Sequence, residues 1–458
     1  MRRKGRILRA EDSQATTGAC AHSAPGPNKP QSSQLRLVHG SAARRLTYDL
    51  GMYANVSRAV ALLSFSLCLS ACGGSSGGDV VPPVVPPVPP PDPTTFHCSK
   101  DASCPEVLII GDPHSVVNNA PDPFRGYGDP SLEYDATTGT LWLAYSWLNT
   151  QVSDPGPPAV FDLGVRTRLA RSDDDGASFT FVRTVNEMQM EAHPDTGVMG
   201  WSTHEVSTLV KEPAGTWQIL WLKYFNPFGT VTGVDERQEF LYWRTTAATP
   251  DFLGDNSVVW GKFAATSESW GAPIDFNAIP ELADCILQTE PGMFAFNGET
   301  YLATSCLVVD GSGRRTDLER IELLRQTPTG YDYVGTILDG QDAADLGVDT
   351  IEQADISVAR DGSIILVVTP IILAADPGHQ GCMVFSFDDF ATASIARDAN
   401  GVAIPRAIIT ADGNSLGPGL CTYDANSDTG VLLVITTVTG SGAATDVEFS
   451  LHATGVHP

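Results

Sequence analysis

The chain contains five copies of one local pattern. Each copy has a leading residue, a short stretch of alternating apolar and polar residues, a turn that contains glycine, and a second stretch rich in apolar residues. Because alternation with a period of two is typical of β-strands, each copy predicts a strand, a tight turn and a second strand. The copies begin 64 to 85 residues apart, at Asp129, Glu205, Glu290, Asp355 and Gly419.

Repeats of this length, built from strands and turns, are typical of the four-stranded blades of a β-propeller. The last copy leaves only 40 residues before the end of the chain, which is too few for a full blade of this size. Residues 106–110, before the first copy, are suited to supply the missing strand and close the ring. We therefore expect an all-β chain with a five-bladed propeller over residues 96–458. A six-bladed propeller and a two-sheet sandwich are the alternatives.

Charge separates this predicted domain from the region before it. The 28 Lys and Arg and 54 Asp and Glu give the chain a net charge of −26, made up of +5 for residues 1–95 and −31 for residues 96–458. Such an acidic domain excludes a nucleic-acid binder that works by neutralising phosphates. It also argues against contact with anionic lipid.

The region before the repeats predicts export. Arg58 precedes an apolar run at residues 59–69, which is too short to cross a bilayer as a helix, and small residues follow it. The run ends in Leu69-Ser70-Ala71-Cys72, which resembles the lipobox of bacterial lipoproteins. The resemblance implies a signal peptide at residues 52–71 and a diacylglycerol on the Cys72 thiol. An ordinary signal peptide with a chance cysteine is the alternative.

Residues on either side of this signal complete the predicted domain plan. Gly73 rather than Asp follows the cysteine, which in lipoproteins of this type favours the outer membrane, facing either the periplasm or the outside. Residues 72–95 form a Gly/Ser and Pro-rich linker that would hold a domain away from the membrane. Residues 1–51 are a basic leader that we do not expect to be part of the fold, with Met52 as the suspected start.

Six cysteines lie beyond the linker, and their even number in an exported chain predicts disulfides. Fifteen pairings of six cysteines are open. Pairing of sequence neighbours suggests Cys98 with Cys104, Cys285 with Cys306, and Cys382 with Cys421. The cysteines show no spacing typical of a zinc site.

One segment resembles a known structural motif. Ser172-Asp-Asp-Asp-Gly-Ala-Ser-Phe179 fits the pattern S-x-D-x-G-x-x-F and resembles the Asp-box of sialidases and related propellers. In that motif the acidic residues and the glycine shape a hairpin turn, and the aromatic residue packs beneath the blade. The resemblance implies a structural turn away from any catalytic face, and it says little about chemistry.

A second resemblance covers more of the chain. Asp129-Pro130 followed by GTLWLAYS, and Glu290-Pro291 followed by NGETYLATS, resemble the first and third blades of the five-bladed arabinanase, xylosidase and invertase group of glycoside hydrolases. That group carries three carboxylates at the starts of the inner strands of its first three blades. The resemblance implies that Asp129, Glu205 and Glu290 are the catalytic residues. The second blade of that group normally has Asp where this chain has Glu205.

The positions of these carboxylates predict the same chemistry without the resemblance. Equivalent residues at the starts of inner strands converge on one mouth of a propeller, so Asp129, Glu205, Glu290 and Asp355 should gather there. Several like charges at close range raise at least one pKa, and a protonated carboxyl beside an ionised one suits hydrolysis of a glycosidic bond. We expect Glu290 to be the acid, Asp129 the base or nucleophile, Glu205 an orienting residue and Asp355 a substrate contact.

Other readings of these acidic residues stay open. They are common in turns, where they cap backbone amides, and a ring of carboxylates also suits Ca²⁺, although the proposed reaction requires no cofactor. Further substrate-binding candidates near the predicted mouth are Arg125, Tyr127, Trp201 and His204.

We expect a glycoside hydrolase that acts on an oligo- or polysaccharide. Two other functions are the alternatives. A sialidase would need three arginines around a substrate carboxylate, and Arg125 is a candidate for the first of them. A non-catalytic carbohydrate-binding or assembly lipoprotein would use the same fold, because propellers host many functions. In each case we expect a monomer whose partner is a carbohydrate.

Overall fold

The fold is known from a computed structural model. Its described residues are 92–99, 103–112, 116–117, 120–154, 160–228, 239–251, 254, 257–261, 276–311, 313–373, 378–412, 419–440 and 446–458. The leader at 1–51, the signal peptide at 52–71, Cys72 and the linker up to residue 91 lie outside them. No helix in the described part is long and apolar enough to cross a membrane. The first strand begins at Thr94, two residues before the predicted start of the domain.

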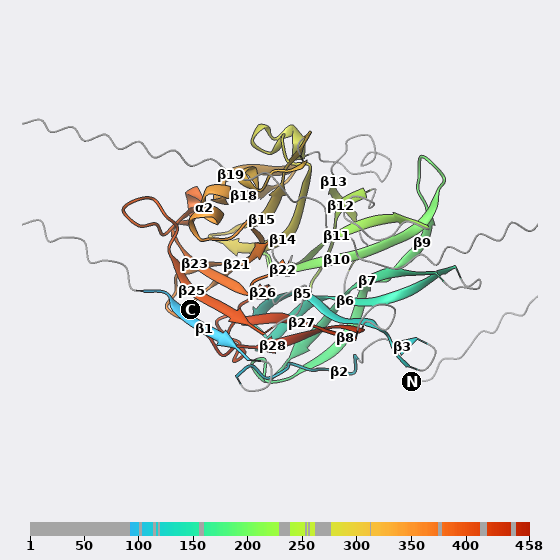
Figure 1. The fold of residues 1–458 in the computed structure, drawn as a ribbon. Helices are drawn as coiled ribbons and strands as arrows, with labels where there is room; N and C mark the ends of the chain where they lie inside the picture. The colour runs from blue at the N-terminus through green and yellow to red at the C-terminus, as the bar shows by residue number, and fades with distance from the viewer. Residues whose placement is uncertain are drawn as a thin grey trace, which may run out of the picture. The chain divides into compact units, whose positions relative to one another are not determined.

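Blades 1 and 2 each have four antiparallel strands, paired in chain order from the inside outwards (Figure 1). Blade 1 consists of β5 (Phe124–Asp135), β6 (Thr140–Asp154), β7 (Val160–Ser172) and β8 (Phe179–Asn186). Blade 2 consists of β10 (Met199–Lys211), β11 (Trp217–Pro227), β12 (Glu239–Ala247) and β13 (Ser257–Gly261), with β9 (Gln189–Ala192) paired to the other edge of β10.

Blades 3 and 4 repeat this arrangement. Blade 3 consists of β14 (Leu287–Phe296), β15 (Glu299–Leu307), β18 (Arg320–Thr327) and β19 (Gly330–Asp339). Blade 4 consists of β20 (Thr350–Val358), β21 (Ile364–Ile372), β23 (Cys382–Asp389) and β25 (Pro405–Ala411), and β1 (Thr94–Cys98) runs parallel to β25 at its outer edge.

Blade 5 has three strands of its own, and the N-terminal part of the chain completes it. Its strands are β26 (Gly419–Thr422), β27 (Leu432–Thr439) and β28 (Asp446–Ala453). At the free edge of β28, Glu106 bridges His452, and the Val107 amide donates to the Leu451 carbonyl at 2.8 Å. The first residues of β5 pair in parallel with the same edge. The predicted closure of the ring by residues 106–110 is confirmed for Glu106 and Val107, whereas β2 (Ile109–Ile110) pairs with β8 of blade 1.

Short elements lie between the blades and between the strands within a blade. They are β3 (Val116–Val117), β4 (Ala120–Pro121), β16 (Val309–Asp310), β17 (Gly313–Arg314), β22 (Gly378–His379), β24 (Ser394–Ile395), the helix α2 (Gly340–Asp345), and 3-10 turns at Phe276–Ala278, Pro280–Leu282, Thr316–Leu318 and Phe390–Thr392.

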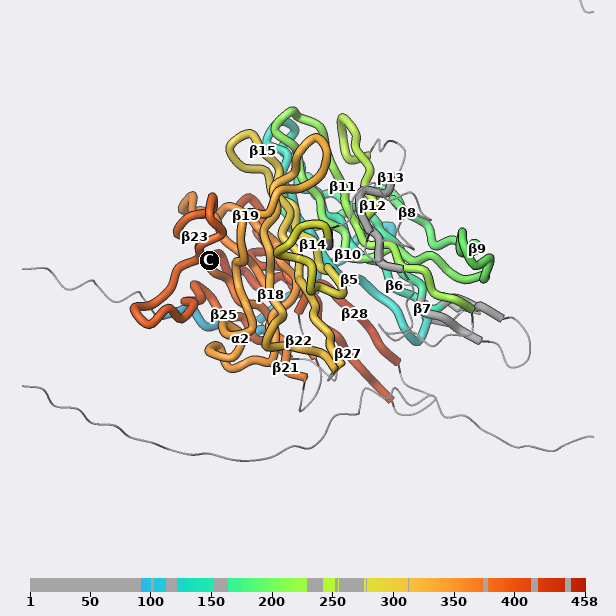
Figure 2. Tube along the Cα trace, turned by 90° about the horizontal axis from the view of Figure 1, so that it is seen from above, coloured from blue at the N-terminus to red at the C-terminus, as the bar shows by residue number. Residues whose placement is uncertain are grey.

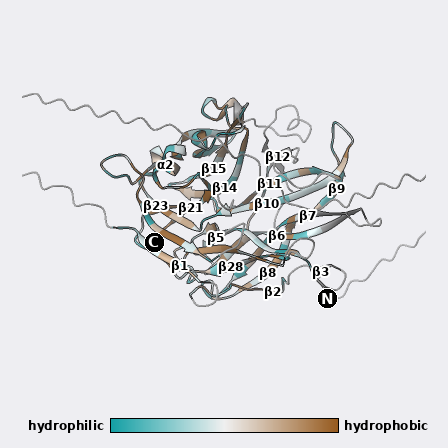
Figure 3. Ribbon diagram, in the orientation of Figure 1, coloured by the Kyte–Doolittle hydropathy of each residue, from teal (hydrophilic) through white to brown (hydrophobic). Residues whose placement is uncertain are grey.

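Contacts between the inner strands establish that the ring is closed with five blades. The inner strands touch in the order β5, β10, β14, β20, β26 and back to β5, and Figure 2 shows the sheets from a second direction. Five clusters of buried apolar side chains lie between successive blades, one at each of the five blade boundaries. Figure 3 shows hydrophobic residues along the strands of these sheets. The expected five-bladed, all-β propeller is confirmed.

The predicted Asp-box turn joins β7 to β8. Ser172 Oγ donates to Asp174 Oδ1 at 2.6 Å and accepts the Gly176 amide at 2.8 Å. Asp174 Oδ1 also accepts the Ser178 amide at 2.9 Å, and Phe179 is fully buried. Ser172 is paired with Leu141, next to the β5–β6 turn, so the motif lies at the end of blade 1 opposite Asp129. It therefore shapes a turn, as its resemblance implies.

Candidate functional site at the bulges of the inner strands

Each of the five inner strands carries a β-bulge at an equivalent position. The pairing with the second strand slips there, and one non-glycine residue takes a positive φ, which is uncommon for side chains of this kind. These residues are Asp129 (φ 47°), Val206 (φ 51°), Glu290 (φ 52°), Gln353 (φ 53°) and Leu420 (φ 54°). The bulges therefore mark five equivalent positions, one on each inner strand of the ring. These positions define the candidate site.

The bulges correct the sequence alignment of the repeats. Asp129 and Glu290 occupy the expected positions, whereas Val206 rather than Glu205 occupies the position on blade 2. On blade 4 the position belongs to Gln353, so Asp355 lies two residues beyond it. The error arose because an extra residue in a bulge interrupts the alternation on which the alignment depended.

Asp129 is held by two donors from neighbouring strands. Ser146 Oγ, on β6, donates to Asp129 Oδ2 at 2.5 Å, and the Val206 amide, on blade 2, donates to the same oxygen at 3.1 Å. Ser146 Oγ also accepts the Val206 amide at 2.9 Å. Hydrogen bonds donated to a carboxylate favour its ionised form. This environment therefore suits an ionised Asp129 in a fixed orientation.

Glu290 has the opposite environment at the equivalent position on blade 3. Its Oε2 is buried and has no hydrogen-bond partner among the described residues, and its Oε1 accepts only a long bond of 3.4 Å from Thr289. Ser305 corresponds to Ser146, yet it accepts the Gln353 amide at 3.1 Å and does not bond to Glu290. Burial, and then the carboxylates of Asp129, Glu352 and Glu205, raise the pKa of Glu290 well above its usual value. Glu290 is therefore suited to hold a proton at a higher pH than an ordinary glutamate does.

Two more carboxylates belong to this group, each one residue before a bulge. Glu205 accepts a hydrogen bond from the Tyr224 hydroxyl. Glu352, on blade 4, pairs with Arg314, and burial raises its pKa while Arg314 opposes that rise. Four carboxylates therefore gather here as expected, but the fourth is Glu352 and not Asp355. Its place one residue before the bulge, like that of Glu205, is the signal that could have identified it.

Arg314 is a cation in contact with this group of carboxylates. The sequence analysis did not identify it. It lies on β17, in the connection between β15 and β18 of blade 3. Its guanidinium makes a two-point pair with Glu319, at 2.6 and 2.8 Å, and a further contact with Glu352. Glu319 in turn accepts the Thr350 hydroxyl at 2.7 Å. Arg314 thus fixes the Glu352 carboxylate from the side of blade 3.

Asp355 lies at the boundary between blades 4 and 5. Its Oδ2 accepts the Thr422 hydroxyl at 2.7 Å and the Tyr423 amide at 3.1 Å, and burial raises its pKa to about 7. Equivalent bonds join three other blade boundaries: Leu209 N to Ser131 Oγ, Met293 N to Thr208 Oγ1, and Leu132 N to Thr422 Oγ1. The observed role of Asp355 is therefore to join two blades. A substrate contact by Asp355 stays a prediction.

The other predicted substrate-binding residues are engaged within the fold. Arg125 pairs with Asp446 at 2.5 Å and Glu448 at 3.0 Å across the boundary of blades 1 and 5. The buried Tyr127 donates to the main-chain oxygen of Asp112.

Trp201 and His204 lie on β10. The Trp201 ring packs edge-on against Phe228 with a centroid separation of 5.9 Å. His204 accepts a hydrogen bond from the Trp221 indole at 3.0 Å, and burial and then Lys223 lower its pKa to about 3.

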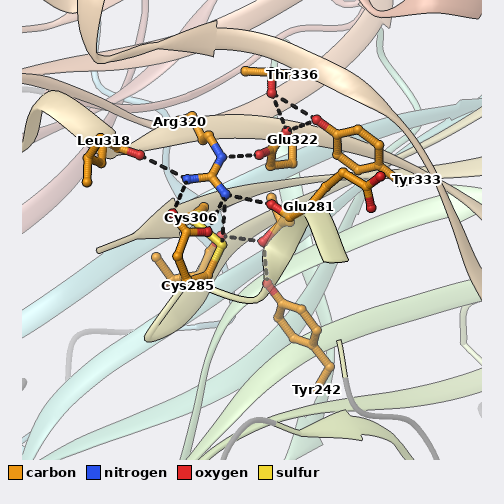
Figure 4. Close-up of a disulfide and its surroundings, with 12 residues drawn as sticks. Tyr242, Glu281, Cys285, Cys306, Leu318, Arg320, Glu322, Tyr333 and Thr336 are labelled. Carbon is orange, nitrogen blue, oxygen red and sulfur yellow. Dashed lines mark hydrogen bonds and ion pairs between the residues drawn. A yellow bond between two sulfur atoms is a disulfide. The ribbon is translucent and has the colours of Figure 1, made fainter. Parts of the chain in front are cut away.

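The three predicted disulfides are present: Cys98–Cys104, Cys285–Cys306 and Cys382–Cys421. Figure 4 shows Arg320 beside the second, donating to the Glu281 carbonyl at 2.7 Å and to Cys285 Sγ at 3.7 Å. This disulfide ties the segment before β14, and hence the approach to Glu290, to β15.

The described residues give limited support for a metal centre. Asp284, Cys285 and Cys306 are the one set of three acidic, histidine or cysteine residues, within the described ranges, whose donor atoms lie within 4.8 Å of one another. The two cysteines form a disulfide, so their sulfurs are not thiolate ligands. The predicted Ca²⁺ ring of carboxylates remains a prediction.

Comparison with known proteins finds solved structures that share the fold at low sequence identity. No protein-family model matches the chain, and no curated protein matches it. A protein of unknown function from Dyadobacter fermentans is 10% identical, with a TM-score of 0.41 over 77% of this chain and 98% of the other. An arabinanase from Bacillus subtilis is 11% identical, with a TM-score of 0.37 over 71% of this chain and 92% of the other.

A Hadza microbial sialidase is also 11% identical, with a TM-score of 0.36 over 68% of this chain and 53% of the other. These TM-scores carry no inference about activity. The assignment of a five-bladed propeller rests on the strand order and the closed ring of inner strands described above.

Proposed function

We propose that the protein is a glycoside hydrolase that acts on an oligo- or polysaccharide with Glu290 as the acid and Asp129 as the base or nucleophile. The observation that carries the proposal is the contrast between these two carboxyl groups at equivalent bulges. Asp129 accepts two hydrogen bonds on one oxygen, whereas Glu290 has a buried oxygen without a partner among the described residues. Two carboxyl groups with opposed protonation states are the equipment of glycosidic-bond hydrolysis.

The proposed reaction gives each carboxyl a separate role. The Glu290 carboxyl gives its proton to the glycosidic oxygen as the bond from that oxygen to the anomeric carbon breaks. The Asp129 carboxylate either removes a proton from the attacking water or attacks the anomeric carbon itself. In the second case a covalent intermediate forms, and water then hydrolyses it while the ionised Glu290 carboxylate takes up the proton of that water. Glu205, held by Tyr224, and Glu352, held by Arg314, add negative charge that keeps Glu290 protonated.

A glycan panel tests the proposal. The wild-type protein and the Glu290→Gln and Asp129→Asn variants are incubated with neutral plant, microbial and animal glycans, and reducing ends are measured. We expect hydrolysis of at least one glycan, and a loss of roughly 10²- to 10⁴-fold in each variant, the range for removal of a general acid or base. The matched control is Glu299→Gln, which changes an exposed glutamate at the start of β15. Full activity in Glu290→Gln would remove Glu290 from its role.

A non-catalytic carbohydrate-binding propeller is the second candidate, and Val206 is the observation that favours it. The hydrolase group that the sequence resembles carries a third carboxylate on blade 2, where this chain has an apolar side chain at the bulge. Saturable binding of a glycan without hydrolysis of any panel member would establish this alternative. A sialidase receives less support, because Arg125 is paired with Asp446 and Glu448.

We further propose that the domain is a monomer attached to the outer membrane, on its periplasmic or outer side, through a lipid on Cys72. The lipobox-like segment and the Pro-rich linker support this proposal. Metabolic labelling with radioactive palmitate should label the wild-type protein and not Cys72→Ala. Equal labelling of both proteins, or of neither, would contradict the anchor.

A further inference from the structure

A cavity of about 250 Å³ lies between blades 1 and 2, apart from the group of carboxylates described above. Blade 2 contributes His204, Lys223 and Trp243 from three successive strands. Val185, at the end of β8, and Gln189, on β9, line the other side. Val185 and Trp243 also pack on the apolar cluster between these blades. The cavity therefore combines apolar and polar lining residues, as small-molecule sites do.

His204 presents a hydrogen-bond donor to this cavity. Its Nδ1 accepts the Trp221 indole N–H at 3.0 Å, so that nitrogen carries no proton. The low pKa of about 3 keeps the ring neutral at physiological pH, and its single proton is therefore on Nε2. Nε2 has no hydrogen-bond partner among the described residues. A ligand oxygen in the cavity would supply one.

The charges around the cavity balance. Lys223 pairs with Glu191 at 2.7 Å and lies 4.7 Å from the centre of the Trp243 ring. Glu187, which also lines the cavity, pairs with Arg166 at 2.8 Å. Each of the two charged lining residues is thus paired with an opposite charge, inside a domain with a large negative charge. This balance disfavours an anionic ligand and suits a neutral one with several hydroxyl groups.

We propose that this cavity binds one neutral sugar ring, as an accessory subsite of the glycan that the central carboxylates act on. The His204 Nε2–H would donate to a sugar hydroxyl, Lys223 and Gln189 would offer further polar contacts, and Val185 and Trp243 would contact the apolar face of the ring. The identity of the ligand rests on the proposed function. The cavity and the central site lie on opposite sides of β10, because His204 and Glu205 are neighbours on that strand.

Nuclear magnetic resonance of the purified full chain, labelled with ¹⁵N at the tryptophan indoles, tests the subsite. The probes are arabinose, xylose, glucose and galactose, with glucuronate as the anionic comparison. The Trp243 signal is identified by its loss in Trp243→Phe. We expect at least one neutral sugar to shift the Trp243 indole signal in a saturable manner. The signal of Trp217, which is buried in the core between the blades, should not move.

A pair of neighbouring substitutions tests the location without removing a buried group. Gln189→Phe places a larger side chain at the cavity, whereas Met190→Phe changes the adjacent exposed residue, which points to the other face of β9. We expect Gln189→Phe to raise the dissociation constant of the sugar by at least about tenfold and Met190→Phe to leave it unchanged.

Three results would overturn the subsite: no neutral sugar shifts Trp243, only glucuronate does, or the two variants weaken binding equally. Hydrolysis is measured separately on the same preparation. Hydrolysis without a shift at Trp243 would overturn the subsite alone. A shift at Trp243 without hydrolysis would support the subsite and overturn the central reaction.

Discussion

The main-chain amide of Val206 donates to Asp129 Oδ2 at 3.1 Å across the boundary between blades 2 and 1. The residue of blade 2 at the bulge thus orients the carboxylate of blade 1 through its backbone, although its own side chain is apolar. Ser146 Oγ bonds to both partners and completes a three-membered hydrogen-bond arrangement. The corresponding Thr369 on blade 4 bonds to Gln353 Oε1 at 3.0 Å and accepts the Leu420 amide at 2.9 Å. The bulges are therefore connected around part of the ring.

Ser146→Ala should lower activity more than an equivalent change on blade 3. It removes the donor at 2.5 Å from Asp129 and leaves the Val206 amide with a single acceptor. We expect a fall in kcat of about tenfold or more, and a loss of about 1.5–3 kcal/mol in the free energy of unfolding, the usual contribution of a hydrogen bond to a charged group. Steady-state kinetics and urea unfolding measure the two effects.

Ser305→Ala is the matched control for this prediction. Ser305 is also buried and accepts the amide of the next bulge residue, Gln353, but it makes no bond to Glu290. We expect a similar loss of stability with a smaller loss of kcat. If both variants lose activity in proportion to their stability, Ser146 serves only the fold.

The raised pKa of Glu290 predicts a specific pH dependence. The acid works only while protonated, so kcat/KM should fall as the pH rises through its pKa, and this fall should lie above the usual range of a glutamate. In Glu290→Gln this fall of kcat/KM at high pH should disappear. The variant should retain more activity on aryl glycosides with good leaving groups than on natural bonds, because such groups need no proton. If kcat/KM of the variant still falls at high pH, the fall belongs to a residue other than Glu290.

The raised pKa of Glu290 should also make the stability of the wild-type protein fall as the pH rises, and Glu290→Gln should remove this contribution. A buried carboxyl with a raised pKa binds more protons in the folded than in the unfolded state, so its contribution to stability is lost as the pH rises. Glutamine does not titrate, and we expect the variant to gain stability relative to the wild type above neutral pH. Thermal unfolding across pH 5 to 9 checks this sign.

Glu133, a partly buried residue on β5, makes a separate contribution to the pH dependence of folding. Burial, and then the neighbouring Asp424, raise the pKa of Glu133 to about 8, far above that of an unfolded glutamate. At a pH between the pKa of an unfolded glutamate and about 8, Glu133 is protonated in the folded protein and ionised in the unfolded one. The free energy of unfolding should therefore fall as the pH rises in this range, by up to about 1.4 kcal/mol per pH unit.

Glu133→Gln should flatten this slope, whereas Glu299→Gln, at an exposed position, should not. Asp355 and Glu290 contribute in the same direction and remain in both variants. Urea unfolding at several pH values gives the slopes. Equal slopes in wild type and Glu133→Gln would show that Glu133 is ionised in the folded protein.

The sequence allowed the number of blades and all three disulfides to be predicted, because both depend on spacing along the chain. Turn glycines and strand alternation recur once per blade, and each cysteine pairs with its neighbour in sequence. The bulges could not be predicted in the same way. Val206 and Leu420 adopt a positive φ that neither side chain favours, so nothing in their residue types marks the position.

The members of the carboxylate group could be predicted only in part, again because of the bulges. Asp129 and Glu290 coincide with bulges and were found, whereas Glu352 was missed because the alternation was counted through an extra residue to Asp355. The contact of Glu352 with Arg314 joins residues from two blades, and no local pattern connects them. Local periodicity thus identifies strands, while the members of a site depend on irregularities in those strands.

The disulfide between Cys382 and Cys421 should contribute more stability than the disulfide between Cys98 and Cys104. It joins β23 of blade 4 to β26 of blade 5, which has only three strands of its own, and it closes a loop with a sequence separation of 39 residues. By loop entropy, the double variant Cys382→Ser/Cys421→Ser should lose about 4 kcal/mol in the free energy of unfolding. Cys98→Ser/Cys104→Ser, with a separation of 6, should lose about 2 kcal/mol. Urea unfolding under oxidising conditions measures both, and a larger loss from the shorter loop would show that contacts within the folded state, and not loop closure, dominate.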